Sequence, residues 1–304
     1  MSSSIGLPKR TSEDDGRKGG ASRLFGAACL PAKSHFRSEA HRMPTLLERL
    51  MSRAIVDPRE ETAFFQALMK ATVYAHIPVS DHIEANSDRV RFIQFHRPDN
   101  GQLVLPFFTD EEKARFAAQS AAQVIAMNGR LLLELTRGAT LMMDPNDCRC
   151  VLYPEEVEGL LRKGRIATIQ KFTVQEGAEP QVGPAQDSPA WLIDGLIPEL
   201  AKLSFVQAAY LAGVYRNNAG APEQTGLVIA LEGEEAQAER AVHAVAAVAQ
   251  PLCEAHNSVS LDLTHFDATI EVPSWISGLA LQPFYDRSWG ARLHQQYGRT
   301  SPAA

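Results

Sequence analysis

The chain has 304 residues, which exceeds a typical single domain of about 100–150 residues and predicts two domains. Hydrophobic residues make up 45% and charged residues 22%, and these ordinary globular proportions exclude a fibrous chain and a chain disordered throughout. The net charge of −6 combines a basic amino terminus, with eight Lys/Arg and four acids in residues 1–42, and a net −10 on residues 43–304. An acidic body repels phosphate groups, so we expect neither nucleic acid nor a membrane as a partner.

The four cysteines lack the paired spacing of a disulfide framework or a zinc site, which favours reduced thiols. No apolar run approaches the roughly 18–20 residues that a membrane-spanning helix needs. The amino terminus also lacks the layout of a secretory signal. We therefore expect a soluble, cytoplasmic protein.

Residues 1–42 are rich in Ser, Gly and charge and show no helical or strand period, so we expect a disordered extension. Two alternatives stay open. One is an organellar transit peptide, although the acidic run Glu13-Asp14-Asp15 disfavours it because such peptides are poor in acids. The other is a start assigned too far upstream, in which case Met43 is the natural beginning of the folded body.

Residues 44–163 have the pattern of one mixed domain. Apolar residues at three-to-four-residue spacing predict helices near residues 46–51 and 64–69. Strands are predicted at 71–79, 90–96 and 102–107, the last two joined by a hairpin turn at Asp99-Asn100-Gly101. Thr109 and Glu112 form a capping-box pattern that predicts a helix over 109–119. The remaining elements alternate strand and helix as far as residue 163.

The second half of the chain begins after a Pro-, Gly- and Gln-rich stretch at 171–189, which we expect to be a linker. Residues 190–290 then predict a second domain in the order helix, strand, strand, helix, strand. The fold class is therefore α/β (α+β), with two mixed sheet-and-helix domains after a disordered amino-terminal extension.

Several of these segments resemble a known family. The stretches LVLPFFTDEEKARFA (103–117) and NGRLLLELTRGATLMMDPNDCRCVLYPEEVEGLL (128–161) are similar to the amino-terminal domain of the SseB (enhanced serine sensitivity) family. Residues 191–287, with AAYLAGVYR, LVIALEG and the closing PFYDR, resemble the second domain of that family. The resemblance implies a bacterial cytoplasmic protein linked by name to serine sensitivity, and it supplies no activity, cofactor or catalytic residue.

The residues give little sign of catalysis. Cys148 and Cys150 stand too close for a CxxC site, and Cys253 with His256 lacks a visible third group to orient the base. Neither a Gly-x-Ser-x-Gly elbow nor a Gly-rich phosphate loop is present. Metal binding by His76, His82 and His96, and acid–base chemistry by Asp262, His265 and Asp267, are weaker interpretations than solvated or structural side chains. We expect no catalytic residue, no metal and no cofactor.

Aromatic residues after proline form the most suggestive surface candidates, at Phe107 and Phe108 and at Phe284 and Tyr285. They either pack the strand ends onto their own domain, which we favour, or contact another protein. The first functional hypothesis is thus a non-enzymatic interaction or regulatory protein. The alternative is an amino-acid-binding protein or undiagnosed enzyme, with an interdomain site around Tyr74, His76, Tyr210 and Tyr215. The sequence specifies no oligomeric state.

Overall fold

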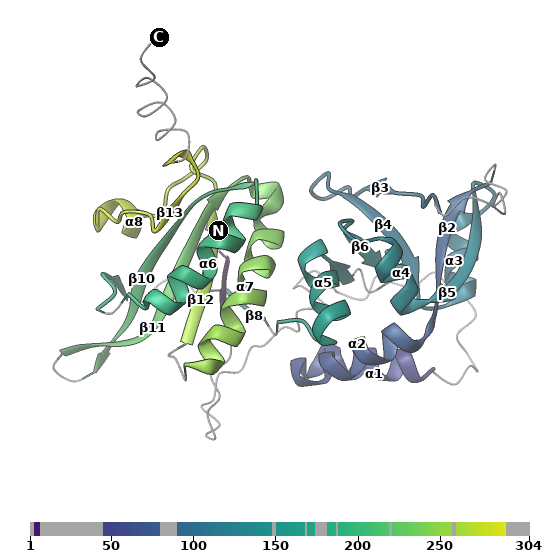
Figure 1. The fold of residues 1–304 in the computed structure, drawn as a ribbon, viewed down its shortest axis with the longest axis horizontal. Helices are drawn as coiled ribbons and strands as arrows, with labels where there is room; N and C mark the ends of the chain where they lie inside the picture. Colours follow the sequence, from purple (N-terminus) through teal and green to yellow (C-terminus); the bar gives the residue numbers. More distant parts are fainter. Residues whose placement is uncertain are drawn as a thin grey trace, which may run out of the picture. The chain divides into compact units, whose positions relative to one another are not determined.

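A computed structural model of the chain describes residues 3–6, 45–79, 90–147, 150–167, 169–173, 181–186, 188–218, 221–256 and 260–289. The chain divides into two compact units, Gly19–Gln170 and Lys171–Ala304 with Met1–Lys18, which we call the amino-terminal and carboxy-terminal units. Each combines helices with a mixed sheet (Figure 1), which confirms the predicted fold class. The expected disordered extension lies outside the described residues, apart from Ser3–Gly6.

The amino-terminal unit contains a six-stranded sheet in the order β5-β2-β4-β6-β7, with β3 paired to β4. β4 and β6 run parallel, and the other pairs are antiparallel. Its strands are β2 (Thr72–Pro78), β3 (Phe95–His96), β4 (Leu103–Phe108), β5 (Ala122–Asn128), β6 (Leu141–Met143) and β7 (Cys150–Leu152). The predicted strand at 90–96 is much shorter than expected, because only its last two residues pair with β4.

The helices of this unit lie on both faces of the sheet. They are α1 (Leu46–Val56), a short 3-10 turn (Pro58–Glu60), α2 (Glu61–Lys70), α3 (Glu111–Ala118), α4 (Gly129–Leu135) and α5 (Pro154–Lys163). Buried side chains of α1, α2, α4 and α5 form one core with alternate residues of β2, β4 and β6, including Phe64, Phe65 and Phe107. Because side chains alternate along a strand, Phe108 points to the other face, where α3 packs. The sheet is therefore covered on both sides around β4.

The carboxy-terminal unit is built on a seven-stranded sheet in the order β13-β10-β11-β12-β1-β8, with β9 paired to β10. β11 and β12 run parallel, whereas β10 and β11 form a long antiparallel hairpin. Its strands are β1 (Ser3–Gly6), β8 (Gln170–Thr173), β9 (Gln181–Gly183), β10 (Val206–Asn218), β11 (Ala221–Gly233), β12 (Ser260–Phe266) and β13 (Tyr285–Asp286).

Helices α6 (Ala190–Lys202) and α7 (Ala238–Ala255) lie side by side on one face of this sheet (Figure 1). A 3-10 turn (Glu235–Gln237) leads into α7, and the short α8 (Ser274–Gly278) packs near β11 and β12 through a small cluster of Ala230, Phe266 and Ile276. The predicted order of helix, strand, strand, helix and strand is present. The range 171–189, expected as a linker, contains most of β8 and all of β9; residues 174–180 and 187 lie outside the described residues.

Candidate functional site

The two parallel strands of the amino-terminal unit end side by side. β4 ends at Phe108 and β6 at Met143, with Phe107 opposite Met143 in the ladder. Ligands of open α/β sheets commonly bind beyond the carboxyl ends of such strands. We call this region, Thr109–Lys113 and Asp144–Asp147, the carboxyl edge, and it is the leading candidate site of this unit.

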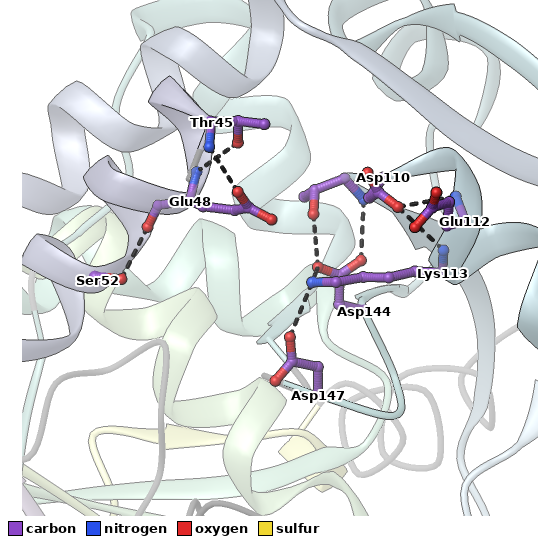
Figure 2. A network of polar contacts seen from close by, with 9 residues as sticks. Thr45, Glu48, Ser52, Asp110, Glu112, Lys113, Asp144 and Asp147 are labelled. Carbon is purple, nitrogen blue, oxygen red and sulfur yellow. Dashed lines mark hydrogen bonds and ion pairs between the residues drawn. The ribbon is translucent and has the colours of Figure 1, made fainter. Parts of the chain in front are cut away.

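Asp144 is the centre of the carboxyl edge, and its side chain is fully buried. Its Oδ1 accepts a hydrogen bond from the backbone N–H of Thr109 at 2.9 Å, and its Oδ2 accepts from the Thr109 hydroxyl at 2.7 Å. Lys113 Nζ donates to the same Oδ2 at 3.1 Å (Figure 2). These three donors offset the cost of taking a carboxylate out of water.

The backbone at Asp144 assists this arrangement. Its φ of 42° lies in the left-handed region, which aspartate tolerates better than most residues. Its N–H donates to the carbonyl of Phe107 at 2.9 Å, so the turn is tied to β4 by main chain as well as side chain. The result is a fixed connection between the end of β6, the end of β4 and the start of α3.

Lys113 bridges two carboxylates, because its Nζ also donates to Asp147 Oδ2 at 2.9 Å. Burial of the ammonium opposes its charge, but the charge of Asp144 and the hydrogen bond and charge of Asp147 outweigh burial and raise the pKa of Lys113 above its ordinary value. An ammonium with a raised pKa stays protonated at neutral pH. Lys113 therefore serves neither as a general base nor as a nucleophile in this arrangement.

The prediction that Thr109 caps the next helix is wrong. Asp110 is the N-cap of α3, where its Oδ1 accepts from the backbone N–H groups of Glu112 at 2.8 Å and Lys113 at 3.2 Å. Thr109 instead gives its hydroxyl and its N–H to Asp144. The physical reason is that the buried carboxylate of Asp144 takes both donors of Thr109, whereas Asp110, one residue nearer to α3, caps the helix.

The four amino-terminal candidates from the sequence lie on β2 and β4. Phe107 and Phe108 are 1% and 2% exposed, so a partner could reach these rings only if the sheet opened. The His76 ring lies 4.8 Å from that of Phe108, and its Nε2 donates to the carbonyl of Ala114 on α3 at 2.9 Å. Tyr74 is half-buried, one strand away from Phe108. These contacts are those of packing residues that hold α3 on the sheet.

The carboxy-terminal unit has a similar aspartate at the same position relative to its parallel strands. Asp267 follows β12, and its Oδ2 accepts from the N–H of Glu235, two residues beyond β11, at 3.4 Å. Among the described side chains no lysine completes this group, and a nearby titratable side chain is that of His265, whose Nδ1 lies 3.8 Å from Glu235 Oε2. Burial lowers the pKa of His265, and the charges of Glu235 and Asp267 oppose that effect only in part.

The carboxy-terminal candidates from the sequence are also held by their own unit. Tyr210 donates to Glu232 Oε2 at 3.2 Å, and burial followed by the charge of Glu232 raises the pKa of Tyr210 to about 12. Tyr215 donates to the carbonyl of Pro184. Tyr285 is buried in β13, and the half-buried Phe284 donates its N–H to Ala209 of β10 at 2.9 Å.

Arg287 is a residue whose role the sequence did not reveal. Its guanidinium donates to the carbonyls of Leu200 at 3.0 Å, Leu203 at 2.6 Å and Val206 at 2.8 Å. Leu200 belongs to the last turn of α6, where a cation also complements the helix dipole. The PFYDR motif therefore fastens α6 and β10 together.

Neither thiol chemistry nor metal binding gains support from the described residues. Burial, and then the charge of Glu254, raises the pKa of Cys253 to about 11, while the ring of His256 stacks on Trp191 at 4.3 Å. Cys150 is buried in β7, and Cys148 and His82 lie outside the described residues. Across the described ranges no three His, Cys, Asp or Glu side chains gather as a metal group, and no helix has the length and hydropathy to cross a bilayer.

Exposed apolar side chains offer a different kind of candidate, an interaction surface. On α1, Leu46 is 61% and Val56 81% exposed, beside the buried Leu47 and Met51 of the same helix. On α4, Leu131 and Leu135 are also exposed, one helical turn apart. Both helices thus carry apolar residues outward as well as inward.

Comparisons with known proteins identify both halves of the chain. The family model described as SseB protein N-terminal domain matches residues 47–159, and the model described as SseB protein C-terminal domain matches residues 174–287. Relatives named Protein SseB from Escherichia coli (strain K12) and Shigella flexneri are each 25% identical over 259 residues, covering 81% of this chain and 94% of the relative. No solved structure matches the chain significantly.

Loss of the buried carboxylate should weaken the amino-terminal unit. We expect Asp144→Ala to destabilise it by about 2–4 kcal/mol, because both donors of Thr109 and the ammonium of Lys113 lose a buried partner. The matched control Asp147→Ala removes the exposed partner of the same lysine and should cost less than about 1 kcal/mol. Native-state hydrogen exchange of the β4 and β6 amides measures both. If the two substitutions lowered the stability of the unit equally, the burial of Asp144 would contribute nothing to that stability.

Acid should weaken the carboxy-terminal unit through His265. Because the folded-state pKa of His265 lies below the ordinary unfolded value of about 6.5, the unfolded chain binds more protons and stability falls as pH drops through that value. Urea unfolding followed by tryptophan fluorescence reports this unit alone, because Trp191, Trp275 and Trp289 all belong to it. We expect the free energy of unfolding to fall less between pH 7.5 and 5.5 in His265→Gln than in the unaltered protein. An unchanged pH dependence in His265→Gln would contradict this assignment.

Proposed function

Because the chain belongs to the SseB family, we propose that it is a non-enzymatic interaction or regulatory protein of the bacterial cytoplasm. The observation that carries this proposal is a contrast between its polar and apolar surfaces. The polar groups best placed for chemistry, at the carboxyl edge, are committed to one another, with Lys113 bridging Asp144 and Asp147. The apolar side chains of Leu46 and Val56 on α1, in contrast, are exposed.

Burial energetics explain why the outward face of α1 supports binding. Leu46 and Val56 each leave more than half of their surface in water, and covering such a side chain stabilises a complex by about 25 cal/mol per Å² of apolar area. Scattered apolar residues are common on monomers, but here Leu46, Ile55 and Val56 are exposed on one helix, and Leu46 lines a depression beside it. A partner surface that covered them would gain both area and shape complementarity.

A second candidate function, binding of an amino acid, is favoured by one contact in the carboxy-terminal unit. Glu232 is half-buried and accepts from Tyr210, and this carboxylate could accept the ammonium group of an amino acid instead. The serine-sensitivity name of the family is compatible with this alternative. Thermal-shift measurements with serine and related amino acids distinguish the two, since a ligand that binds the native state must stabilise it.

The interaction proposal makes a direct prediction in cells. A photo-crosslinking residue placed at Val56 should give a discrete adduct with another protein, whereas the same residue at Thr269, exposed on the carboxy-terminal unit, should give none. Adduct masses on denaturing gels and mass spectrometry of the bands provide the measurement. The proposal fails if Val56 gives no adduct while serine or a related amino acid produces a saturable thermal shift that Glu232→Gln removes.

A further inference from the structure

Helices α1 and α2 pack side by side (Figure 1). A groove lies between the start of α1 and α2. The groove has a volume of about 460 Å³. It is lined by Leu46, Leu47, Ala63, Gln66, Ala67, Lys70 and Ala71. We call it the α1–α2 groove.

The floor of the α1–α2 groove is apolar and shallow. Ala63 and Ala67 stand one helical turn apart on α2, and their short side chains let another backbone approach closely. Leu46 projects from the opposite wall and is 61% exposed, although it stands next to the buried Leu47. A narrow apolar trough of this kind is the surface that receives an amphipathic helix in helix-in-groove recognition.

The start of α1 is fixed, so the groove is preformed on this side. Thr45 and Glu48 form a reciprocal capping box: the Thr45 N–H donates to Glu48 Oε2 at 2.6 Å, and the Glu48 N–H donates to Thr45 Oγ1 at 3.2 Å (Figure 2). This cap holds the first turn that carries Leu46. A wall that is already ordered costs less conformational entropy when a partner binds.

The rim of the groove is basic, in a body with a net charge of −10. Lys70 lines it directly, and Arg49 and Arg53 follow Leu46 at three and seven residues, on the same side of α1. All three cationic side chains are exposed, and among the described residues none has an ion-pair partner. A basic rim around an apolar floor is complementary to a segment that carries both apolar and acidic side chains.

We propose that the α1–α2 groove binds one amphipathic helix of a partner protein, with apolar anchors at i, i+3 or i+4 and i+7 and with Asp or Glu on its flanks. This inference rests on the proposed interaction function and adds the chemistry of the partner. α2 has 10 residues and is therefore about 15 Å long, so about three turns of the partner helix would cover the groove. A second copy of this chain fits poorly, because two grooves facing each other across a twofold axis would bring their basic rims together.

The test uses helical peptides of about 16 residues displayed with fixed apolar positions at i, i+3, i+4 and i+7 and random flanks, selected against the full-length chain. We expect the selected flanks to be enriched in Asp and Glu over Lys and Arg. Ala63→Glu places a carboxylate on the groove floor and should weaken the selected peptides at least tenfold. Thr62→Glu, the same change at the adjacent exposed position outside the groove, should leave their affinity within about twofold.

Charge reversal at the rim provides the second arm. Lys70→Glu should weaken acidic peptides and shift a repeated selection towards Lys and Arg, which a purely hydrophobic site would not do. The inference is overturned if the selected peptides lack an acidic bias, or if Ala63→Glu and Thr62→Glu weaken them equally. It is also overturned if phosphatidylglycerol vesicles bind the groove and no peptide is selected, since the surface would then be a membrane contact.

These outcomes separate this inference from the proposed function. Adducts from Val56 in cells without any peptide selected at the groove would leave the interaction function standing and remove the groove as its site. Peptides selected at the groove without adducts in cells would support the chemistry of the groove and count against a cellular partner.

Discussion

The amino-terminal unit depends on one buried carboxylate. Asp144 receives two hydrogen bonds from Thr109 and one from Lys113, and so joins the ends of β4 and β6 to the first turn of α3. Helix α3 then holds the outer face of the sheet, partly through the bond between His76 and Ala114. A buried charge is tolerated only when it is paired and hydrogen-bonded, so all three donors must be in place together. That requirement fixes the geometry of the whole carboxyl edge.

The same requirement bears on the proposed function. Lys113 is bound by both Asp144 and Asp147, and its raised pKa keeps it protonated at neutral pH, so this lysine supplies neither a base nor a nucleophile. The carboxy-terminal unit uses Asp267 at the corresponding place, where it accepts from Glu235 and Thr269. In both units an aspartate follows the second of the two parallel strands, β6 or β12. This aspartate accepts hydrogen bonds from the segment that follows the first of them, β4 or β11. Both edges are thus held by structural hydrogen bonds, which supports the proposal that binding uses exposed apolar side chains such as Leu46 and Val56 of α1.

Periodicity and turn signals were enough to predict the order of the longer helices and strands, because each of them carries its pattern locally, whereas the short β8 and β9 lie in a range that was expected to be a linker. Gly101, for example, has the positive φ of 69° that the predicted hairpin turn needs. The sequence could not predict the pairing of Lys113 with Asp144, since these residues are 31 apart and meet only through the parallel register of β4 and β6. The role of Arg287 was hidden for the same reason, because its carbonyl partners lie more than 80 residues earlier. The clue that was available, an aspartate directly after a buried strand, became interpretable only when the strand order was known.

The charge state of Lys113 tests the central claim, that the carboxyl edge is a closed structural ion pair. Carbon and nitrogen NMR shifts of the Lys113 side chain, followed in the full chain from pH 8 to 11, report its protonation directly. The account predicts that Lys113 titrates above the ordinary lysine value and that it titrates at a lower pH in Asp144→Asn, where the charge that raises its pKa is gone. A Lys113 that titrates below the ordinary lysine value of about 10.4 in the unaltered protein would contradict the account and would return acid–base chemistry to this edge.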